Sequence, residues 1–203
     1  MAPHSARVDR TGKEPPVTNV ASLGLILRFR DFVTEVGGTV SEHRKVLRQY
    51  GHVWWGWWYR QSEYIPRRVL ASLFSEDASR HVPILLFHSG IFELYSAYAT
   101  RVVVAPPSID GISSPDYGTT PDYYLRGRFP AWFRFEQDIV PVQAATVPIV
   151  GRPTAGHEAD RLPEATATAE EVQLAALGCE RPTLWLFESD VKLSRGGAVQ
   201  KVT

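Results

Sequence analysis

The sequence contains a single cysteine, Cys179, among 203 residues, and no excess of charge of either sign. One cysteine cannot form an intramolecular disulfide or a cysteine-rich zinc site, so the chain fits a reducing cytoplasm. Lys plus Arg and Asp plus Glu both number 22, which gives a formal net charge of zero. This balance argues against sequence-independent duplex binding, which needs a basic surface. It leaves open the binding of one nucleotide, or one flipped base, in a pocket.

Long apolar runs and known catalytic motifs are also missing. No run reaches the roughly 18 apolar residues of a membrane span, and the N-terminus has no signal-peptide core. The phosphate loop, the dinucleotide-binding G-x-G-x-x-G, the zinc motif H-E-x-x-H and the nucleophile elbow G-x-S-x-G do not occur. The scattered histidines have no carboxylates at metal-ligand spacing, and no base is evident that could activate Cys179. We therefore expect no metal and no cofactor, and we assign no catalytic residue.

The most unusual stretch runs from His52 to Arg68 and holds four of the six tryptophans within five positions. On a strand, Trp55 and Trp57 share one face and Trp58 lies on the other, so large rings remain on the face away from the core. Gly56 leaves a gap between them where a ligand or another backbone can approach. Stacking on such rings contributes about 1–3 kcal/mol per nucleobase. Ordinary core packing is the alternative, because aromatic rings also dominate cores.

We expect one domain over residues 20–189, after a disordered polar leader at 1–19 and before a tail at 190–203. Several predicted strands follow one another without helices between them. This order favours an α+β fold, a mixed or antiparallel pseudo-barrel of about six or seven strands with about three short helices. The expected strands lie at 20–32, 54–60, 84–90, 92–104 (with a bulge or bend), 131–135, 139–150 and 183–188, and the expected helices at 39–50, 67–74 and 168–177.

Two local signals refine these expectations. Thr39 and Glu42 have the spacing of a capping box, which predicts the start of the first helix, and Gly51 predicts its end. The segment 105–121 contains six prolines and glycines in a long loop, and loops of this length are often functional.

Candidate ligand-binding residues stand at several strand ends. Arg28 and Arg30 project from the first strand and can bind a phosphate or carboxylate, although solvated arginines are equally compatible. His88 and Ser89 end a buried strand, where ligand pockets often open; a histidine bonded to backbone is the alternative. Glu63 can accept hydrogen bonds from base amino or imino groups, or it is simply a charge at a helix N-terminus.

A second cluster follows the long loop. Tyr123 and Tyr124 precede the strand at 131–135, on which Trp132 and Arg134 share a face. Tyrosine and tryptophan beside an arginine can stack on and hold an anionic planar ligand.

Four segments, ILLFHSG, TPDYY, AWFRFEQDI and TLWLFES, resemble the PUA-like superfamily, particularly its EVE-type members. The block LILRFRDF…VWWGWW…TPDYY…AWFRF also resembles an N-terminal module found beside some bacterial calcineurin-like phosphoesterases. Two departures matter. The WLF-type strand opens EVE domains but lies near the end of this sequence, and the phosphoesterase signatures are absent, so no hydrolase activity is implied.

The resemblance implies a small pseudo-barrel that holds a modified base or a nucleotide in an aromatic cage. Trp55, Trp57 and Trp132 would be its walls. His88, Ser89 and Glu63 would read the polar edges of the ligand.

Three hypotheses of function follow. The first is a non-enzymatic sensor that recognises a modified or unmodified nucleobase or nucleotide, free or in nucleic acid, in bacterial defence or regulation. The second is a protein–protein adaptor that uses exposed tryptophans as interface anchors. The third is a nucleotide-processing enzyme with His88 or Glu63 as general acid–base.

Overall fold

The computed structural model describes residues 22–59, 63, 65–74, 81–142, 148–153, 167–168, 183–189, 192–193 and 199–200. The leader predicted at 1–19, most of the helix predicted at 168–177 and most of the predicted tail lie outside these residues. Thr168 itself belongs to a short strand. No helix in the described part of the chain is long and apolar enough to cross a membrane.

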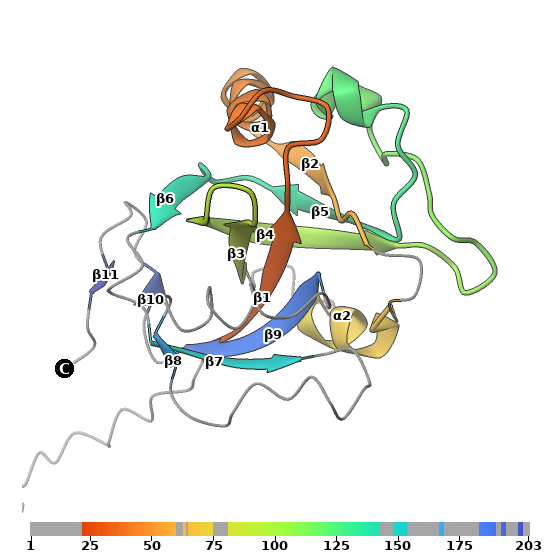
Figure 1. Cartoon of the computed structure of the whole chain (residues 1–203). Coiled ribbons are helices and arrows are strands. Elements are labelled where there is room, and N and C mark those ends of the chain that lie inside the picture. The colour runs from red at the N-terminus through yellow and green to blue at the C-terminus, as the bar shows by residue number, and fades with distance from the viewer. Residues whose placement is uncertain are drawn as a thin grey trace, which may run out of the picture.

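Two α-helices, two short 3-10 helices, a mixed main sheet and a separate two-stranded sheet of β10 and β11 make up the described fold (Figure 1). The helical elements are α1 (Gly38–Tyr50), α2 (Arg67–Leu73), η1 (Tyr117–Thr119) and η2 (Asp122–Tyr124). The strands are β1 (Ser22–Phe29), β2 (Val53–Gly56), β3 (Val82–His88), β4 (Glu93–Val104), β5 (Ala131–Phe135), β6 (Val140–Val142), β7 (Pro148–Pro153), β8 (Ala167–Thr168), β9 (Leu184–Ser189), β10 (Lys192–Leu193) and β11 (Val199–Gln200).

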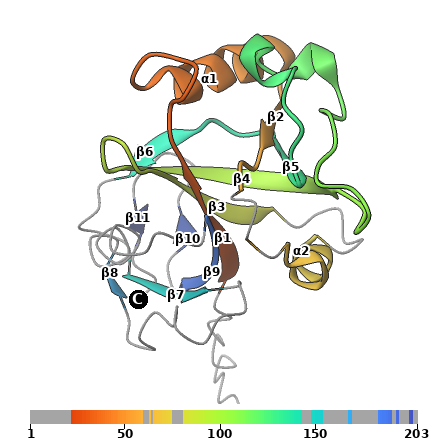
Figure 2. The same ribbon diagram turned by 45° about the vertical axis from the view of Figure 1, so that its right-hand side comes forward.

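The main sheet has nine strands in the described residues, in the order β2-β5-β4-β3-β1-β9-β7-β8, with β6 paired to β4. β1 runs parallel to β3, with Leu25 opposite Ile84, and antiparallel to β9 on its other side. The sheet curls, with α1 and α2 on opposite sides of it (Figures 1 and 2). The predicted α+β fold with a mixed sheet is therefore confirmed.

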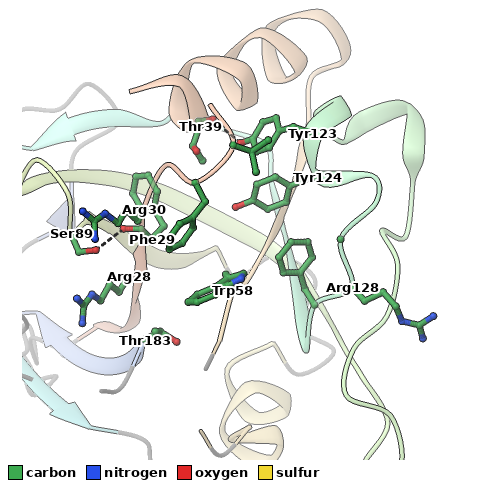
Figure 3. Close-up of a pocket in the computed structure, with 14 residues that line it drawn as sticks. Arg28, Phe29, Arg30, Thr39, Trp58, Ser89, Tyr123, Tyr124, Arg128 and Thr183 are labelled. Atoms are coloured by element: carbon green, nitrogen blue, oxygen red, sulfur yellow. Dashed lines mark hydrogen bonds between the residues drawn. The ribbon is translucent and has the colours of Figure 1, made fainter. Parts of the chain in front are cut away.

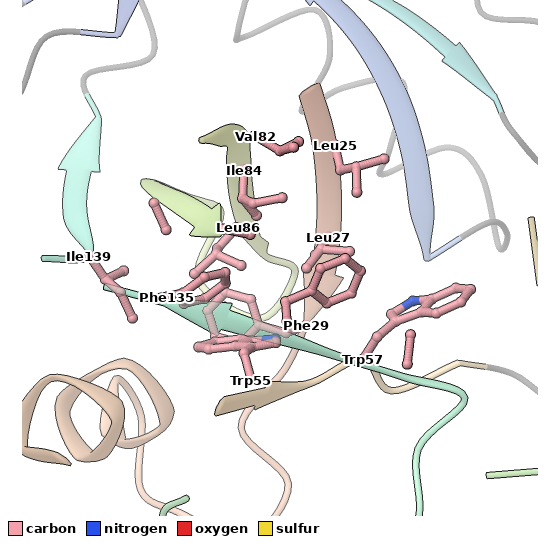
Figure 4. Close-up of a cluster of buried hydrophobic side chains, with 14 of the residues drawn as sticks. Leu25, Leu27, Phe29, Trp55, Trp57, Val82, Ile84, Leu86, Phe135 and Ile139 are labelled. Atoms are coloured by element: carbon pink, nitrogen blue, oxygen red, sulfur yellow. The ribbon is translucent and has the colours of Figure 1, made fainter. Parts of the chain in front are cut away.

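The core lies inside the curl of the sheet (Figure 4). Leu25, Leu27 and Phe29 alternate into it from β1, and they meet Ile84 and Leu86 from β3. β3 is buried along almost its whole length, as predicted for a central strand. Buried side chains from β1, β2, β3, β4, β5 and β9 thus form one apolar interior.

The first helix does not begin with the predicted capping box. Its N-cap is Gly37 in the left-handed conformation (φ 78°), and the free N–H groups bond to a residue further back in the chain. Asp31 accepts the N–H of Gly37 at 2.7 Å and that of Thr39 at 3.1 Å. An aspartate six residues before the N-cap thus replaces the local cap. Glu42 instead pairs with Lys45 at 2.5 Å.

Other local predictions agree with the structure. α1 ends at Gly51 (φ 77°), whose N–H donates to the Leu47 carbonyl at 2.8 Å. β4 changes register between Ala99 and Arg101 where it pairs with β5, which is the expected irregularity. The long loop after β4 is folded back by an isolated bridge between Ile112 and Phe129. That bridge places Phe129 beside the tryptophan strand.

Candidate functional site

A pocket of about 640 Å³ opens where the end of β1, the residues after β2 and the loop before β5 meet (Figure 3). This volume is in the usual range for small-molecule sites, about 300–1,000 Å³. The lining residues are Arg28, Phe29, Arg30, Phe32, Val33, Thr39, Trp58, Ser89, Tyr123, Tyr124, Gly127, Arg128, Phe129 and Thr183.

Two pairs of aromatic rings face the pocket. Trp58 is 46% exposed, and Phe32, at 64%, lies 5.1 Å from it between ring centroids. Tyr124 stacks on Phe129 at 5.0 Å with an interplanar angle of 19°. Figure 3 shows Trp58 and Tyr124 on different sides of the same space. A planar ligand can therefore meet aromatic surface on both sides.

The floor of the pocket is Phe29, the last residue of β1, which is only 7% exposed. Its ring makes edge contacts with Trp55 at 5.1 Å and with His88 at 4.7 Å. Trp55 and His88 thus support the floor from behind and do not line the pocket. Ser89 lies at the rim, and its hydroxyl donates to the Phe29 carbonyl at 3.1 Å.

A buried polar chain reaches the pocket through Thr183. The Trp57 indole N–H donates to the Thr183 hydroxyl at 3.0 Å, and this hydroxyl donates to Glu63 Oε2 at 2.5 Å. The second carboxylate oxygen of Glu63 is buried without a hydrogen-bond partner among the described residues. Glu63 and Trp57 therefore orient a hydroxyl in the pocket wall, because Thr183 itself lines the pocket.

A second buried polar contact beside the pocket joins Asp31 and His88. His88 Nε2 donates to Asp31 Oδ2 at 2.7 Å, while Nδ1 accepts the N–H of Gly90 at 3.0 Å. Burial alone would raise the pKa of Asp31, but hydrogen bonds from His88, Thr39 and Gly37 outweigh it and hold the pKa below its usual value. Both ring nitrogens of His88 are engaged, which matches the interpretation of a histidine bonded to its surroundings.

The tyrosine pair supplies uncharged hydroxyl groups. Tyr124 points its hydroxyl toward the space between Phe29 and Trp58 (Figure 3). Burial raises the pKa of both Tyr123 and Tyr124 well above the usual value, so both stay neutral. The Tyr123 hydroxyl lies 3.3 Å from Nδ1 of His43, whose pKa burial lowers to about 4.

Arginines flank the pocket on two sides. Arg28 and Arg30 lie at the end of β1, and both line the pocket; that they bind a phosphate or carboxylate stays a prediction. Arg128 lines it from the loop before β5, but its side chain points away from Trp58 and Tyr124 (Figure 3). Its guanidinium donates twice to the Gly111 carbonyl, from Nε at 3.1 Å and from Nη2 at 2.9 Å.

Three predicted walls lie elsewhere. Trp55 and Trp57 are 1% and 2% exposed and belong to the main core, and Trp132 is fully buried. The gap expected at Gly56 is filled, since a Cβ added there would lie 2.5 Å from the Phe129 ring. The prediction that these rings face a ligand is wrong, because packing covers both faces of the strand.

Arg134 also lies away from the pocket. On β5, Arg134 lies opposite Trp54 of β2. Its Nη1 forms an ion pair with Oε1 of Glu136 at 3.2 Å. The predicted group of two tyrosines, Trp132 and Arg134 is therefore divided. The two tyrosines line the pocket. The Trp132 ring packs against the Phe129 ring, with 4.9 Å between their centroids, and neither Trp132 nor Arg134 lines the pocket.

Several lining residues were not predicted from the sequence. Phe32 and Val33 follow Arg30 in a polar loop, and an aromatic residue in such a loop is a signal that could have been used. Phe129 and Thr183 have no local signal, because each reaches the pocket through a distant backbone contact. Phe129 pairs with Ile112, and the Thr183 carbonyl accepts the Arg28 N–H at 2.8 Å.

The mixed sheet and its helices define an α+β domain with an aromatic pocket between flanking arginines. The chain matches the Pua-like family over residues 25–148 and belongs to that family, which confirms the PUA-like resemblance. Pua-like domains bind nucleic acids or nucleobases. No curated protein and no solved structure matches the chain.

Proposed function

We propose that this protein is a non-enzymatic binding module that holds one nucleobase, free or within nucleic acid, in the pocket between Trp58 and Tyr124. The observation that carries the proposal is the half-exposed Trp58 ring across a pocket of about 640 Å³ from the stacked Tyr124 and Phe129 rings. Contiguous exposed apolar surface often marks a ligand-binding groove, and the exposed Trp58 ring lies beside the exposed Phe32 ring. A base inserted here would gain stacking from both sides.

The polar groups of the pocket fit the edges of a base and its phosphate. The hydroxyls of Tyr124 and Thr183 offer short, neutral hydrogen-bonding groups, and Glu63 fixes the direction of the Thr183 hydroxyl. Arg28 and Arg30 line the side of the pocket at which a phosphate can meet a guanidinium fork. This division, with rings for the base and arginines for the phosphate, is compatible with a neutral chain.

A sensor function is favoured over catalysis by the state of His88. A general base needs a free lone pair within reach of the substrate, but His88 is 2% exposed and has both nitrogens engaged. We propose that the bound base is read and not transformed, as expected for a regulatory or defence sensor.

Isothermal titration with the nucleoside 5′-monophosphates of RNA and DNA tests the proposal. At least one should bind, and Trp58→Ala should weaken its binding by about 1–3 kcal/mol, the value of one stacked base. Tyr50→Ala is the matched control, because Tyr50 is also half exposed but does not line the pocket. Equal affinity of wild type and Trp58→Ala would rule out the pocket as the site.

One observation favours a second function, the protein–protein adaptor. The loop after β1 exposes Phe32 at 64%, Val33 at 75% and Val36 at 73%, and exposed apolar clusters often mark interfaces. An adaptor should self-associate or retain a partner on gel filtration, and Val33→Ser should abolish that association. A monomer at high concentration that binds nucleotides favours the pocket.

A further inference from the structure

A second hollow lies next to the pocket and shares a residue with it. It is shallower, with a volume of about 540 Å³, and is lined by Tyr59, Ser108, Ile109, Asp110, Gly111 and Arg128. Arg128 lines both hollows. Trp58 lines the first and Tyr59, the next residue, lines the second, so neighbouring rings of one segment serve neighbouring hollows.

The chemistry of this groove suits a nucleoside. Tyr59 is half-buried, and its hydroxyl donates to the Asp110 carbonyl at 3.2 Å, which fixes the ring at the groove wall. Ser108 and the Asp110 carboxylate can accept hydrogen bonds from a base amino group or a ribose hydroxyl. The carboxylate also disfavours a phosphate deep in the groove, so a phosphate belongs at its border.

Arg128 stands at that border. Its Nε–H and one N–H of Nη2 are used at the Gly111 carbonyl, and a guanidinium has five N–H donors in all. The carbonyl holds the side chain toward the groove, and the remaining donors suit a phosphate oxygen. Arg28 and Arg30 line the other side of the pocket.

We propose that the groove is a second nucleotide subsite, and that the ligand is a single strand of nucleic acid rather than a free nucleotide. This proposal rests on the function proposed for the pocket. One base occupies the pocket beside Trp58, the adjoining nucleoside stacks on Tyr59, and the phosphate between them meets Arg128. Single strands are favoured because both bases must present an open face to a ring.

Titration of the full chain with nucleoside 5′-monophosphates and with single-stranded pentanucleotides of one base each, in DNA and RNA, tests the subsite. The best pentanucleotide should bind at least about tenfold tighter than its monophosphate. Tyr59→Ala should weaken pentanucleotide binding about 5- to 150-fold, the effect of one stacked base, and leave monophosphate binding unchanged. Tyr59→Phe keeps the ring and should retain most of the affinity.

Ser108→Glu provides a second variant on an exposed residue, so its folding should be unaffected. The added carboxylate should weaken pentanucleotide binding alone. Pentanucleotides that bind no tighter than monophosphates, or a Tyr59→Ala effect that is equal for both, would overturn the subsite.

Trp58→Ala separates the two proposals. If monophosphate binding depends on Trp58 and pentanucleotides bind no tighter, the proposal for the pocket is supported and the proposal for the groove is contradicted. If pentanucleotide binding depends on Tyr59 but not on Trp58, the groove is supported as a binding site and the pocket is contradicted. Failure of every probe to bind the wild-type chain removes both.

Discussion

Asp31→Asn should destabilise the fold more than any other single change of charge near the pocket. The carboxylate is 4% exposed and accepts bonds from His88 Nε2 at 2.7 Å and from the backbone N–H groups of Gly37 and Thr39 at 2.7 and 3.1 Å. Asparagine retains one acceptor oxygen, and its amide NH₂ must face a donor. We therefore expect one or two unsatisfied buried donors, at about 1–3 kcal/mol each.

The expected loss is about 2–4 kcal/mol in the free energy of unfolding at pH 7. For a domain of this size, that lowers Tm by roughly 4–16 °C. Urea and thermal unfolding followed by circular dichroism measure both quantities. Glu35→Gln is the matched control, because it removes a carboxylate from the same loop at an exposed position, and surface changes of this kind stay within about 0.5 kcal/mol.

The pH dependence gives an independent check. The folded-state pKa of Asp31 is lowered, so its stabilising contribution is complete above the unfolded pKa of about 3.9 and is lost as pH falls through the folded pKa. The stability difference between wild type and Asp31→Asn should be constant from pH 7 to 5 and shrink below about pH 4. No difference at pH 7, or one that grows in acid, would refute the reasoning.

Three further predictions concern the residues beneath the pocket. Gly56→Ala should destabilise the chain by about 1–3 kcal/mol in urea unfolding, because the new Cβ meets the Phe129 ring at 2.5 Å. Trp57→Phe removes the donor to Thr183. It should lower the free energy of unfolding by about 1 kcal/mol and weaken nucleotide binding in titrations. If stability and binding were both unchanged, the role of the polar chain would be contradicted. The pKa of His43 is lowered to about 4, so its share of stability is complete above pH 6.5 and falls as pH drops toward 4; His43→Phe should flatten the wild-type decline of the urea midpoint over that range.

Local patterns in the sequence predicted most elements but not the residue that caps the first helix. Alternating apolar residues and glycine signals identify β5 and the end of α1, since those signals act within a few residues. Asp31 lies six residues before the N-cap Gly37, and nothing in the spacing of Thr39 and Glu42 reveals that it takes over the capping.

The candidate site was predicted only in part, because only some of its residues have a signal in the nearby sequence. Arg28, Arg30 and Ser89 sit at strand ends, and strand ends can be read from hydrophobic periodicity. Alternation also separated Trp55 and Trp57 from Trp58 correctly. Periodicity does not reveal which face of a strand a second layer covers. The resemblance supplied Trp55, Trp57 and Trp132 as walls of a cage, and all three belong to the core.

The place of Thr183 gives the pocket a dependence on the whole sheet. This residue precedes β9, which pairs with β1 at the far end of the sequence, and more than 150 residues separate Arg28 from the backbone carbonyl that it bonds. Closing so long a loop is an entropically late event in folding. A ligand that touches Thr183 therefore binds only the completed domain. By mass action, its binding should stabilise β1 and β9 together against unfolding.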